Sequence, residues 1–245
     1  MRAILCKDYG PPESLVLEDI ESPTAGENDV VIKVHNAAVN YPDVLVIQNL
    51  YQIKPPLPFS PGGEVSGEVI ALGDKVDTLK IGDRVMAVIG TGGFREEIAI
   101  PAALCMPIPD SLDFKLAAAM GLTYGTSYHA LKDRARIQAG ETLFIMGASG
   151  GVGLAAVELG KSMGARVIAA ASSEDKLQVC RDHGADDTIL YKTGGLSPDE
   201  QKAFSEEVKN LTDGKGVDVV YDAIGGDYAE PAVRAMAWGG RYLVV

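Results

Sequence analysis

A seven-residue glycine-rich stretch is the part of this sequence whose residue types and spacing most clearly permit chemistry. It follows an apolar run at 142–146 and precedes an alanine-rich helical stretch that begins near residue 152. Its pattern is an A-x-G-x-x-G variant of the dinucleotide fingerprint, in which Ala148 replaces the first glycine. Glycine matters most at the second position, where the backbone approaches a pyrophosphate, and at the third, where helix and strand pack closely. The cofactor-binding residues predicted here are Ala148, Ser149, Gly150, Gly151, Val152 and Gly153.

A helix that starts directly after this stretch would add a second attraction for phosphate. Backbone N–H groups at a helix N-terminus point at a bound anion, and the helix dipole favours negative charge there. The competing interpretation is a strand-to-helix turn that uses glycine only for a positive φ. The placement of the stretch between a strand and an amphipathic helix of one βαβ unit favours the cofactor.

The residues that select NAD or NADP are expected about twenty residues further along the chain, at the end of the second strand. An acidic side chain there would hold the ribose 2′-hydroxyl of NAD, but the sequence is Ala170-Ala171-Ser172-Ser173. This small loop leaves room for a 2′-phosphate, whose charge Lys176 would balance, although the two residues before Lys176 are acidic. Alternatively, a serine only caps the next helix and Lys176 is a solvated surface lysine. We expect NADPH, bound with the help of Ser172, Ser173 and Lys176.

The second half of the chain has the pattern expected of elements that hold such a turn. From Leu116 onward, alanine-rich helical stretches alternate with β-branched runs, which is typical of a parallel sheet wound with helices. The predicted strands are 142–146, 166–170, 187–190, 218–221 and 241–245, and the predicted helices are 152–163, 174–183, 198–211 and 228–237. A doubly wound sheet ordinarily has a sixth strand, whereas this chain ends on an apolar, strand-like run. We therefore expect a fragment that stops after the fifth strand.

The first half, up to about residue 110, has a different pattern. Apolar or alternating runs at 30–34, 65–72 and 84–89 are separated by glycine-containing turns, which predicts a small β-barrel. Four prolines crowd residues 55–61, where they remove backbone donors and forbid a central strand, so a rigid loop is expected there. The predicted boundary lies near Gly125, with domains at 1–124 and 125–245.

Composition restricts which partners and cellular environments the protein can have. The 245 residues include 34 acidic and 22 basic side chains, and the net charge of −12 would repel nucleic acid. No apolar run reaches the roughly eighteen residues of a membrane span, and Lys7 and Asp8 interrupt the N-terminus before any signal-peptide core. The three cysteines lie far apart and form no disulfide framework. We expect a soluble, cytoplasmic protein without a membrane or nucleic-acid partner.

Several motifs resemble one enzyme family, in the family's order and over nearly the whole chain. In the second half they are the glycine turn with Gly140-Glu141-Thr142-Leu143 before it, residues 164–173 and Gly184-Ala185-Asp186. In the first half they are Val39-Asn40-Tyr41-Pro42-Asp43, residues 55–64 and residues 80–85. The chain resembles the zinc-free NADPH:quinone reductase branch of the medium-chain dehydrogenase/reductase superfamily. The resemblance implies an α/β protein with a GroES-like β-barrel domain followed by a doubly wound Rossmann domain, and a homodimer for the full-length form.

The sequence departs from the zinc-dependent members of that superfamily. Those relatives have a cysteine near Val39-Asn40 and a histidine in a Gly-His-Glu motif, which here reads Gly62-Gly63-Glu64, and the cysteine-rich structural-zinc loop is missing. Tetrahedral zinc needs thiolate and imidazole ligands, so no metal site is predicted and oxidation of a metal-held alkoxide is excluded. The histidines, interpreted as structural or surface residues, are His35, His129 and His183.

Without a metal, the expected chemistry is hydride transfer from the nicotinamide to an electron-poor acceptor such as a quinone. The resemblance places Asn40, Tyr41 and Asp43 in the segment that faces the nicotinamide, with Tyr51 in the neighbouring loop. Asn40 could donate a hydrogen bond to the acceptor oxygen, and Tyr51 a hydrogen bond or a proton. Asp43 is expected to orient its neighbours. Alternatively, Asn40 holds a turn and Tyr51 packs on the proline loop.

Three further cofactor candidates lie outside the glycine turn. Thr123 falls in the segment where the family's threonine meets the nicotinamide carboxamide, and hydrogen bonding within its own helix is the alternative. Tyr191 follows the third strand, where the family often brings an aromatic ring near the adenosine, and a plain strand-end tyrosine is the alternative. Gly225 lies after the fourth strand, on the carboxyl edge where ligands bind in such sheets.

Two other functions fit the same residues. A 2-enoyl thioester or alkenal reductase shares the fold, the cofactor and the hydride chemistry, and the substrate choice lies in loop shape. A non-catalytic crystallin-like or cofactor-binding protein is an alternative of another class. The sequence favours an NADPH-dependent oxidoreductase that acts on a small quinone-type acceptor.

Overall fold

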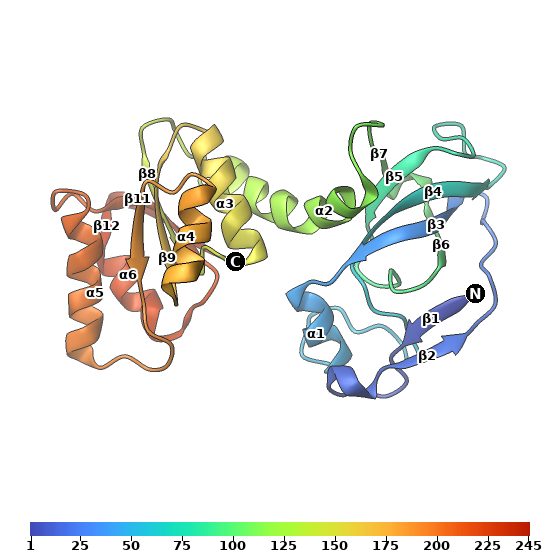
Figure 1. Ribbon diagram of the computed structural model, residues 1–245, viewed down its shortest axis with the longest axis horizontal. Coiled ribbons are helices and arrows are strands. Elements are labelled where there is room, and N and C mark those ends of the chain that lie inside the picture. Colours follow the sequence, from blue (N-terminus) through green and yellow to red (C-terminus); the bar gives the residue numbers. More distant parts are fainter. The chain divides into compact units, whose positions relative to one another are not determined.

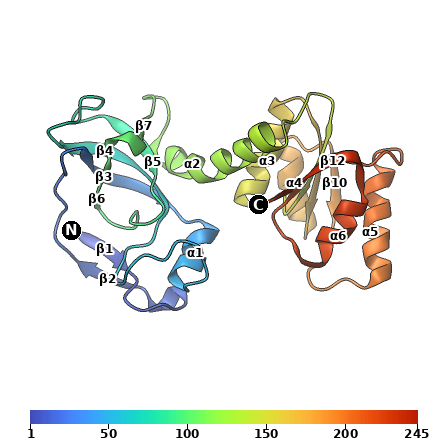
Figure 2. The same cartoon turned by 180° about the vertical axis from the view of Figure 1, so that it is seen from behind.

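The structure, a computed structural model, describes residues 1–245, and its contacts divide the chain into two compact units. The first unit is Met1–Leu122 and the second is Thr123–Val245. Figures 1 and 2 show the elements of each unit from opposite sides. The first is built around antiparallel strands and the second around a parallel sheet with helices, as the sequence predicts.

An antiparallel five-stranded sheet forms the centre of the first unit. Its strand order is β6 (Glu97–Pro101), β3 (Asp29–Ala38), β4 (Glu64–Leu72), β5 (Arg84–Val88) and β7 (Cys105–Pro107). These strands bury one apolar cluster, which includes Val30, Ile32, Val65, Val69 and Val85. The three predicted apolar runs fall on β3, β4 and β5, where each fully buried aliphatic side chain contributes roughly 1.5–3 kcal/mol.

Smaller elements of the first unit lie outside the predicted strands. They are the hairpin of β1 (Arg2–Leu5) and β2 (Val16–Asp19), the helix α1 (Tyr41–Ile47), and the 3₁₀ turns η1 (Pro12–Ser14) and η2 (Ala102–Leu104). β3 continues to Ala38, past the predicted end at Val34, and passes close to β4 at Gly67. A Cβ on Gly67 would lie 2.1 Å from the Lys33 carbonyl oxygen, so only glycine fits there. The proline-rich residues 55–61 form no helix or strand beyond one isolated bridge, as predicted.

A five-stranded parallel sheet forms the centre of the second unit. Its strand order is β10 (Asp187–Leu190), β9 (Arg166–Ala171), β8 (Thr142–Met146), β11 (Val217–Asp222) and β12 (Met236–Val244). The connecting helices are α3 (Gly151–Ser162), α4 (Glu174–Asp182), α5 (Pro198–Asn210) and α6 (Ala229–Arg234), with the 3₁₀ turn η4 (Gly226–Tyr228) before the last. The chain runs from β8 through β9 to β10 and then returns to β11 on the other side of β8, so the predicted doubly wound order is confirmed.

One long helix belongs to both halves of the chain. α2 (Phe114–Tyr128) begins in the first unit, ends in the second, and continues as the π-helical turn η3 (His129–Arg134). None of the helices combines the length and the apolar character needed to cross a membrane.

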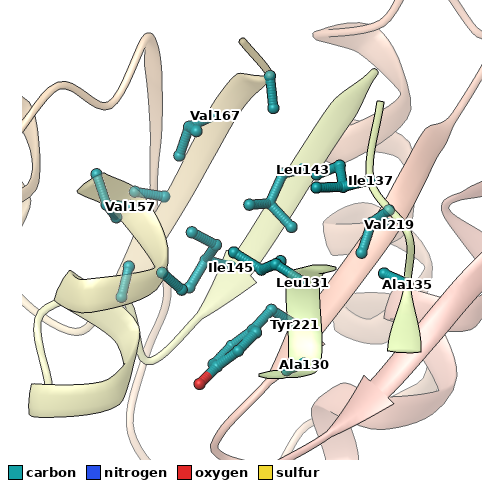
Figure 3. Close-up of a cluster of buried hydrophobic side chains, with 14 of the residues drawn as sticks. Ala130, Leu131, Ala135, Ile137, Leu143, Ile145, Val157, Val167, Val219 and Tyr221 are labelled. Carbon is teal, nitrogen blue, oxygen red and sulfur yellow. The ribbon is translucent and has the colours of Figure 1, made fainter. Parts of the chain in front are cut away.

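Both faces of the parallel sheet are buried. Leu143 and Ile145 of β8 face the apolar cluster drawn in Figure 3, to which α3 contributes Val157. Phe144 and Met146, which alternate with them, face a second cluster that residues of α5 and α6 complete. Burial on both faces explains why β8 is a continuous apolar run rather than an alternating one.

The last helix and strand differ from the prediction. The helical stretch predicted to reach Ala237 ends at Arg234, and β12 begins at Met236, well before the predicted start at Arg241. Met236 pairs with Val217, but the next pair joins Arg241 to Val219, so residues 237–240 bulge out of the ladder. Gly239 lies in this bulge with φ +82°. The prediction was wrong because a bulge interrupts the local pattern from which a strand is recognised.

Candidate functional site

The glycine turn lies between β8 and α3, at the carboxyl end of the parallel sheet. Gly147 follows β8 with φ +73°, and a Cβ on it would lie 2.9 Å from the Ile224 side chain. Gly150 is the N-cap residue of α3, and its N–H donates to the Gly147 carbonyl oxygen at 3.1 Å. The chain therefore reverses from strand to helix in the tight turn that the fingerprint needs.

The three fingerprint positions have different surroundings. A Cβ on Gly153 would lie 2.3 Å from the Gly147 carbonyl oxygen, so α3 can pack on the turn only with glycine there. A Cβ on Gly150 would meet only that oxygen, at 3.4 Å, and Gly150 is exposed, which leaves its backbone accessible to a ligand. Ala148 is fully buried in the core, and its N–H donates to the Ala170 carbonyl oxygen at 3.0 Å. The methyl group at the first position therefore belongs to the core.

The N-terminus of α3 lacks a side-chain acceptor. Gly150 provides no cap, and the first turn of α3 contains no acidic residue. By contrast, Ser173 caps α4 and Ser197 caps α5, and both of those helices have acidic residues in the first turn. The first N–H groups of α3, together with the helix dipole, thus favour an external anion such as a pyrophosphate. The partly buried Ser149 and Val152 and the exposed Gly151 complete the predicted stretch.

The turn lies where the strand order reverses. β8 has β9 on one side and β11 on the other, and ligands of open α/β sheets bind outside the carboxyl ends of strands at such a point. Gly225 follows β11 there with φ +62°, and its N–H donates to Asp222 Oδ1 at 2.8 Å. The buried Asp222 also accepts hydrogen bonds from the Ile224 N–H and the Tyr242 hydroxyl. Asp222 therefore fixes the backbone around Gly225.

The residues predicted to choose the cofactor lie together at the end of β9. Lys176 Nζ donates to Ser172 Oγ at 3.1 Å, and Ser173 caps α4 by accepting from the Lys176 N–H at 3.4 Å. Glu174 pairs with Arg181 instead of Lys176. The helix cap at Ser173 and the contact of Lys176 with Ser172 thus occur side by side. The capping interpretation and the 2′-phosphate interpretation of this loop are therefore compatible.

The two remaining cofactor candidates occupy different surroundings. A Cβ on Gly151 would lie 3.1 Å from Thr123 Cγ2, so α2 brings Thr123 to the glycine turn. The Tyr191 ring packs against Tyr228, with 5.1 Å between the ring centroids, at the edge of the core cluster around Phe144. Burial raises the pKa of the Tyr191 hydroxyl. Tyr191 is half-buried, and its role towards a cofactor stays a prediction.

A polar cluster that the sequence analysis missed ties α2 and α4 to α3. The Tyr124 hydroxyl donates to Glu158 Oε2, and His183 Nδ1 lies 2.5 Å from Glu158 Oε1. The hydrogen bond to Glu158 raises the pKa of Tyr124 to about 12. That bond and the one from His183 hold the pKa of Glu158 below its usual value, against the effect of burial. These contacts hold the end of α2 against α3, and Thr123, the residue before Tyr124, thereby stays close to the glycine turn.

In the first unit, Asn40 and Asp43 organise the start of α1. Asn40 is the N-cap residue, and its backbone N–H donates to Asp43 Oδ2 at 2.8 Å. Asp43 is buried, and its other oxygen accepts from the Gly62 N–H at 3.2 Å. Burial raises the pKa of the Asp43 carboxyl, while the N–H donors of Asn40, Gly62 and Gly63 oppose that rise. Asp43 therefore orients the backbone that carries Asn40.

Glu64 is a second buried carboxylate beside Asn40, and the sequence pattern assigned it no role. Asn40 Nδ2 donates to Glu64 Oε1 at 2.9 Å, and the Leu122 N–H donates to Glu64 Oε2 at 2.8 Å. The available signal was an acidic residue at the very start of a buried apolar strand. Tyr51 is not part of this network, since it packs against the apolar cluster of α1 and Phe59.

The structure brings together no group of three or more His, Cys, Asp or Glu side chains that could hold a metal ion. His35 stacks on Phe114, with 4.3 Å between the ring centroids, and His129 pairs with Asp133 on η3. The three cysteines are unpaired. A zinc-free mechanism stays a prediction.

Two family models match the chain in the order of its units. The alcohol dehydrogenase GroES-like domain matches residues 26–110, and the zinc-binding dehydrogenase model matches residues 151–245. The quinone oxidoreductase-like protein 2 homolog of Nematostella vectensis is 40% identical over 100% of this chain and 65% of that protein. The quinone oxidoreductase of Rattus norvegicus is 34% identical over 100% of this chain and 73% of that protein. The chain thus spans about two thirds of the length of the curated relatives it matches.

Solved structures agree with both units. The quinone oxidoreductase of Thermus thermophilus, also solved in complex with NADPH, has a TM-score of 0.83 at 32% identity, covering 99% of this chain and 72% of that chain. An NAD-dependent alcohol dehydrogenase has a TM-score of 0.90 at 34% identity, covering 99% and 76%. The CurK enoyl reductase has a TM-score of 0.88 at 28% identity, covering 98% and 72%.

A GroES-like unit followed by a dinucleotide-binding unit with an open glycine turn defines a medium-chain dehydrogenase/reductase, a superfamily of oxidoreductases. The chain belongs to the quinone oxidoreductase branch of that superfamily, because relatives with that name match it from end to end.

Alanine substitutions at two of the fingerprint glycines should affect different properties, one the stability of the fold and the other dinucleotide binding. Gly153→Ala forces a methyl group against backbone, which cannot relax as a side chain can, so it should destabilise the protein by about 1–3 kcal/mol. Gly150→Ala should cost less than about 1 kcal/mol of stability but weaken dinucleotide binding about tenfold. Urea unfolding and nicotinamide fluorescence measure the two effects. Equal destabilisation by both substitutions would contradict the roles assigned to these glycines.

Removal of the Tyr124 hydroxyl should change how stability depends on pH. Because the folded pKa of Glu158 is lowered, its stabilisation is present above the unfolded value of about 4.3 and is lost as the pH falls through the folded value. Since the pKa of Tyr124 is raised to about 12, its own stabilisation is present below about pH 10 and is lost as the pH rises through 12.

Tyr124→Phe should therefore be less stable than the parent between about pH 5 and pH 9, and the difference should shrink at about pH 3. Urea unfolding at each pH gives the comparison, with the exposed Tyr128→Phe as the matched control. A difference that is the same at both ends of this range would show that the Tyr124–Glu158 hydrogen bond does not account for the pKa values.

Proposed function

We propose that this chain acts as an NADPH-dependent oxidoreductase that transfers hydride to a quinone-type acceptor without zinc. The observation that carries the proposal is the uncapped N-terminus of α3, directly after the glycine turn and at the reversal of the strand order. The N–H groups from Gly151 to Gly153 would hold the pyrophosphate of the cofactor. Bound NADPH would supply the hydride, and the protein would bind and orient the cofactor and the acceptor.

The end of β9 supports NADPH over NADH. A lysine ammonium beside a serine hydroxyl, Lys176 beside Ser172, suits a 2′-phosphate, and no acidic side chain stands at the place typical of NAD binding. The Thermus thermophilus relative has been solved with NADPH, whereas another similar structure is that of an NAD-dependent alcohol dehydrogenase. Thr123, Tyr191 and Gly225 are proposed to line the nicotinamide and adenosine ends.

We propose that Asn40 donates a hydrogen bond to the acceptor oxygen, as the family resemblance suggests. Asn40 Nδ2 carries two N–H groups, and Glu64 accepts one of them. The second N–H would stabilise negative charge that develops on the acceptor oxygen as hydride arrives. Asp43 would hold the backbone of Asn40, and Tyr51 would be a further donor or an apolar contact for the acceptor.

The proposal also covers the absence of zinc, the location and oligomeric state of the protein, and the class of its partner. Zinc is not used, because Gly63 stands where zinc-dependent relatives have a histidine and no thiolate stands near Asn40. The full-length form is proposed to be a homodimer, as the resemblance implies. A cytoplasmic location is proposed because the sequence has no apolar run long enough for a membrane span and no signal-peptide core. The net charge of −12 supports a small-molecule partner rather than nucleic acid.

An enoyl or alkenal reductase is the second candidate function. The CurK enoyl reductase resembles this chain at a TM-score of 0.88, which favours this candidate. Hydride delivered to the β-carbon of an α,β-unsaturated carbonyl would use the same cofactor site and the same stabilisation of an acceptor oxygen. A crystallin-like role would be indicated if the chain binds NADPH but turns over no acceptor of either kind.

Replacement of Lys176 tests the cofactor proposal. Lys176→Ala should weaken NADPH binding by about tenfold to a hundredfold, the loss of one charge-assisted phosphate contact, and leave NADH binding within about twofold. Titration of each nicotinamide by fluorescence measures both, with Lys202→Ala of α5 as the control for loss of an exposed lysine. Equal weakening of NADPH and NADH, or unchanged binding of both, would contradict the 2′-phosphate site.

Acceptor choice is tested by turnover with matched substrates. The proposed function predicts NADPH oxidation by a benzoquinone that exceeds the rates with a 2-alkenal and with a 2-enoyl thioester. Asn40→Ala should lower kcat with the quinone by about tenfold to a hundredfold and leave NADPH binding unchanged. Faster reduction of the alkenal or the thioester would replace the quinone proposal with the second candidate.

A further inference from the structure

We infer that Glu64 is a positioning residue that sets the side-chain amide of Asn40 for the acceptor. This inference rests on the proposed function, in which Asn40 meets the acceptor oxygen. It adds a residue that neither the fingerprint nor the family resemblance assigns to hydride transfer in this chain.

The surroundings of Glu64 are unusual for a carboxylate. Glu64 is the first residue of β4, its side chain is 1% exposed, and no lysine, arginine or histidine lies within ion-pair distance. Burial of a carboxylate without a cation costs desolvation free energy that hydrogen-bond donors must offset. The donors to Glu64 therefore indicate what its carboxylate does.

Both oxygens of Glu64 have a donor, and the two donors come from different elements. Oε1 accepts from Asn40 Nδ2 at 2.9 Å, at the start of α1, and Oε2 accepts from the Leu122 backbone N–H at 2.8 Å, in α2. Gly121 allows the second contact, because a Cβ on it would lie 2.4 Å from the Val88 side chain and 3.2 Å from Oε2. The bond to the helix backbone thus holds the carboxylate at a fixed place in front of Asn40.

The chemistry of the pair fixes the orientation of the amide. Both Glu64 oxygens accept hydrogen bonds, so Asn40 turns its NH₂ group, and not its oxygen, towards Glu64. The remaining N–H of the same group is then the one that can meet an acceptor oxygen. Asp43 holds the backbone of Asn40 and Glu64 holds its side chain, so the two carboxylates divide the task.

Glu64→Gln is the sharpest test, because glutamine has nearly the same shape but only one acceptor oxygen. One of the two donors would then face an NH₂ group, and the amide of Asn40 would lose its fixed orientation. Turnover of NADPH with a benzoquinone should fall by about tenfold to a hundredfold, while NADPH binding stays within about twofold. Glu68→Gln, a partly exposed acid on the same strand, is the matched control and should change neither quantity. Glu64→Asp, which keeps the charge but shortens its reach, serves if the glutamine variant does not fold.

The decisive comparison repeats the change in the Asn40→Ala protein. There Glu64→Gln should cause no further loss of turnover beyond about twofold, because residues that act as a unit are not additive. An equal loss in both backgrounds would overturn the inference. A ¹H–¹⁵N spectrum gives a readout that needs no turnover, in which the Asn40 side-chain protons, assigned by their absence in Asn40→Ala, should be well separated in the parent and converge in Glu64→Gln.

Unchanged Asn40 resonances in Glu64→Gln would overturn the inference even if the proposed function holds. Conversely, the absence of quinone turnover in the parent, with NADPH bound, would overturn the proposed function. The separation of the Asn40 protons would still show whether Glu64 orients the amide, so the two failures are distinguishable.

Discussion

The close contact between the start of α3 and the turn after β8 is the constraint on which the cofactor unit depends. With Gly153 against the Gly147 carbonyl oxygen, the axis of α3 is brought down onto the end of β8, and the first N–H groups of the helix emerge at the edge of the sheet. Gly150, the N-cap residue of α3, has no side chain that could accept from these N–H groups. The close packing at Gly153 and the uncapped start at Gly150 together produce a helix terminus whose donors and dipole favour an external anion.

The first unit uses buried carboxylates for a comparable purpose. Asp43 and Glu64 both lie in the interior, and both accept hydrogen bonds mainly from backbone and amide N–H groups rather than from cations. Such an arrangement costs desolvation, and it fixes the loops that carry the donors. The start of α1 and the start of α3 are thus both organised without a salt bridge, and candidate residues of each unit lie at these places.

The sequence predicted what depends on local pattern. The glycine turn, the strands of the parallel sheet and the cap at Ser173 all rest on residues close together in the chain, and the fold followed from them. The bulge in β12 and the contact between Asn40 and Glu64 depend on pairings between distant segments, for which single residues give no periodic signal. Lys176 shows the intermediate case, since its spacing suggested a role and only the structure directed its ammonium at Ser172.

The measurement that most directly tests the central claim is a titration of the ¹⁵N-labelled chain with inorganic pyrophosphate and then with NADPH, followed through the backbone amide resonances. If the start of α3 is the anion site, the amides from Gly151 to Gly153 should shift saturably with both ligands, while those at the capped start of α5 remain still. Saturable shifts confined to other segments, or none at α3 with NADPH bound, would contradict the claim that this helix terminus holds the pyrophosphate.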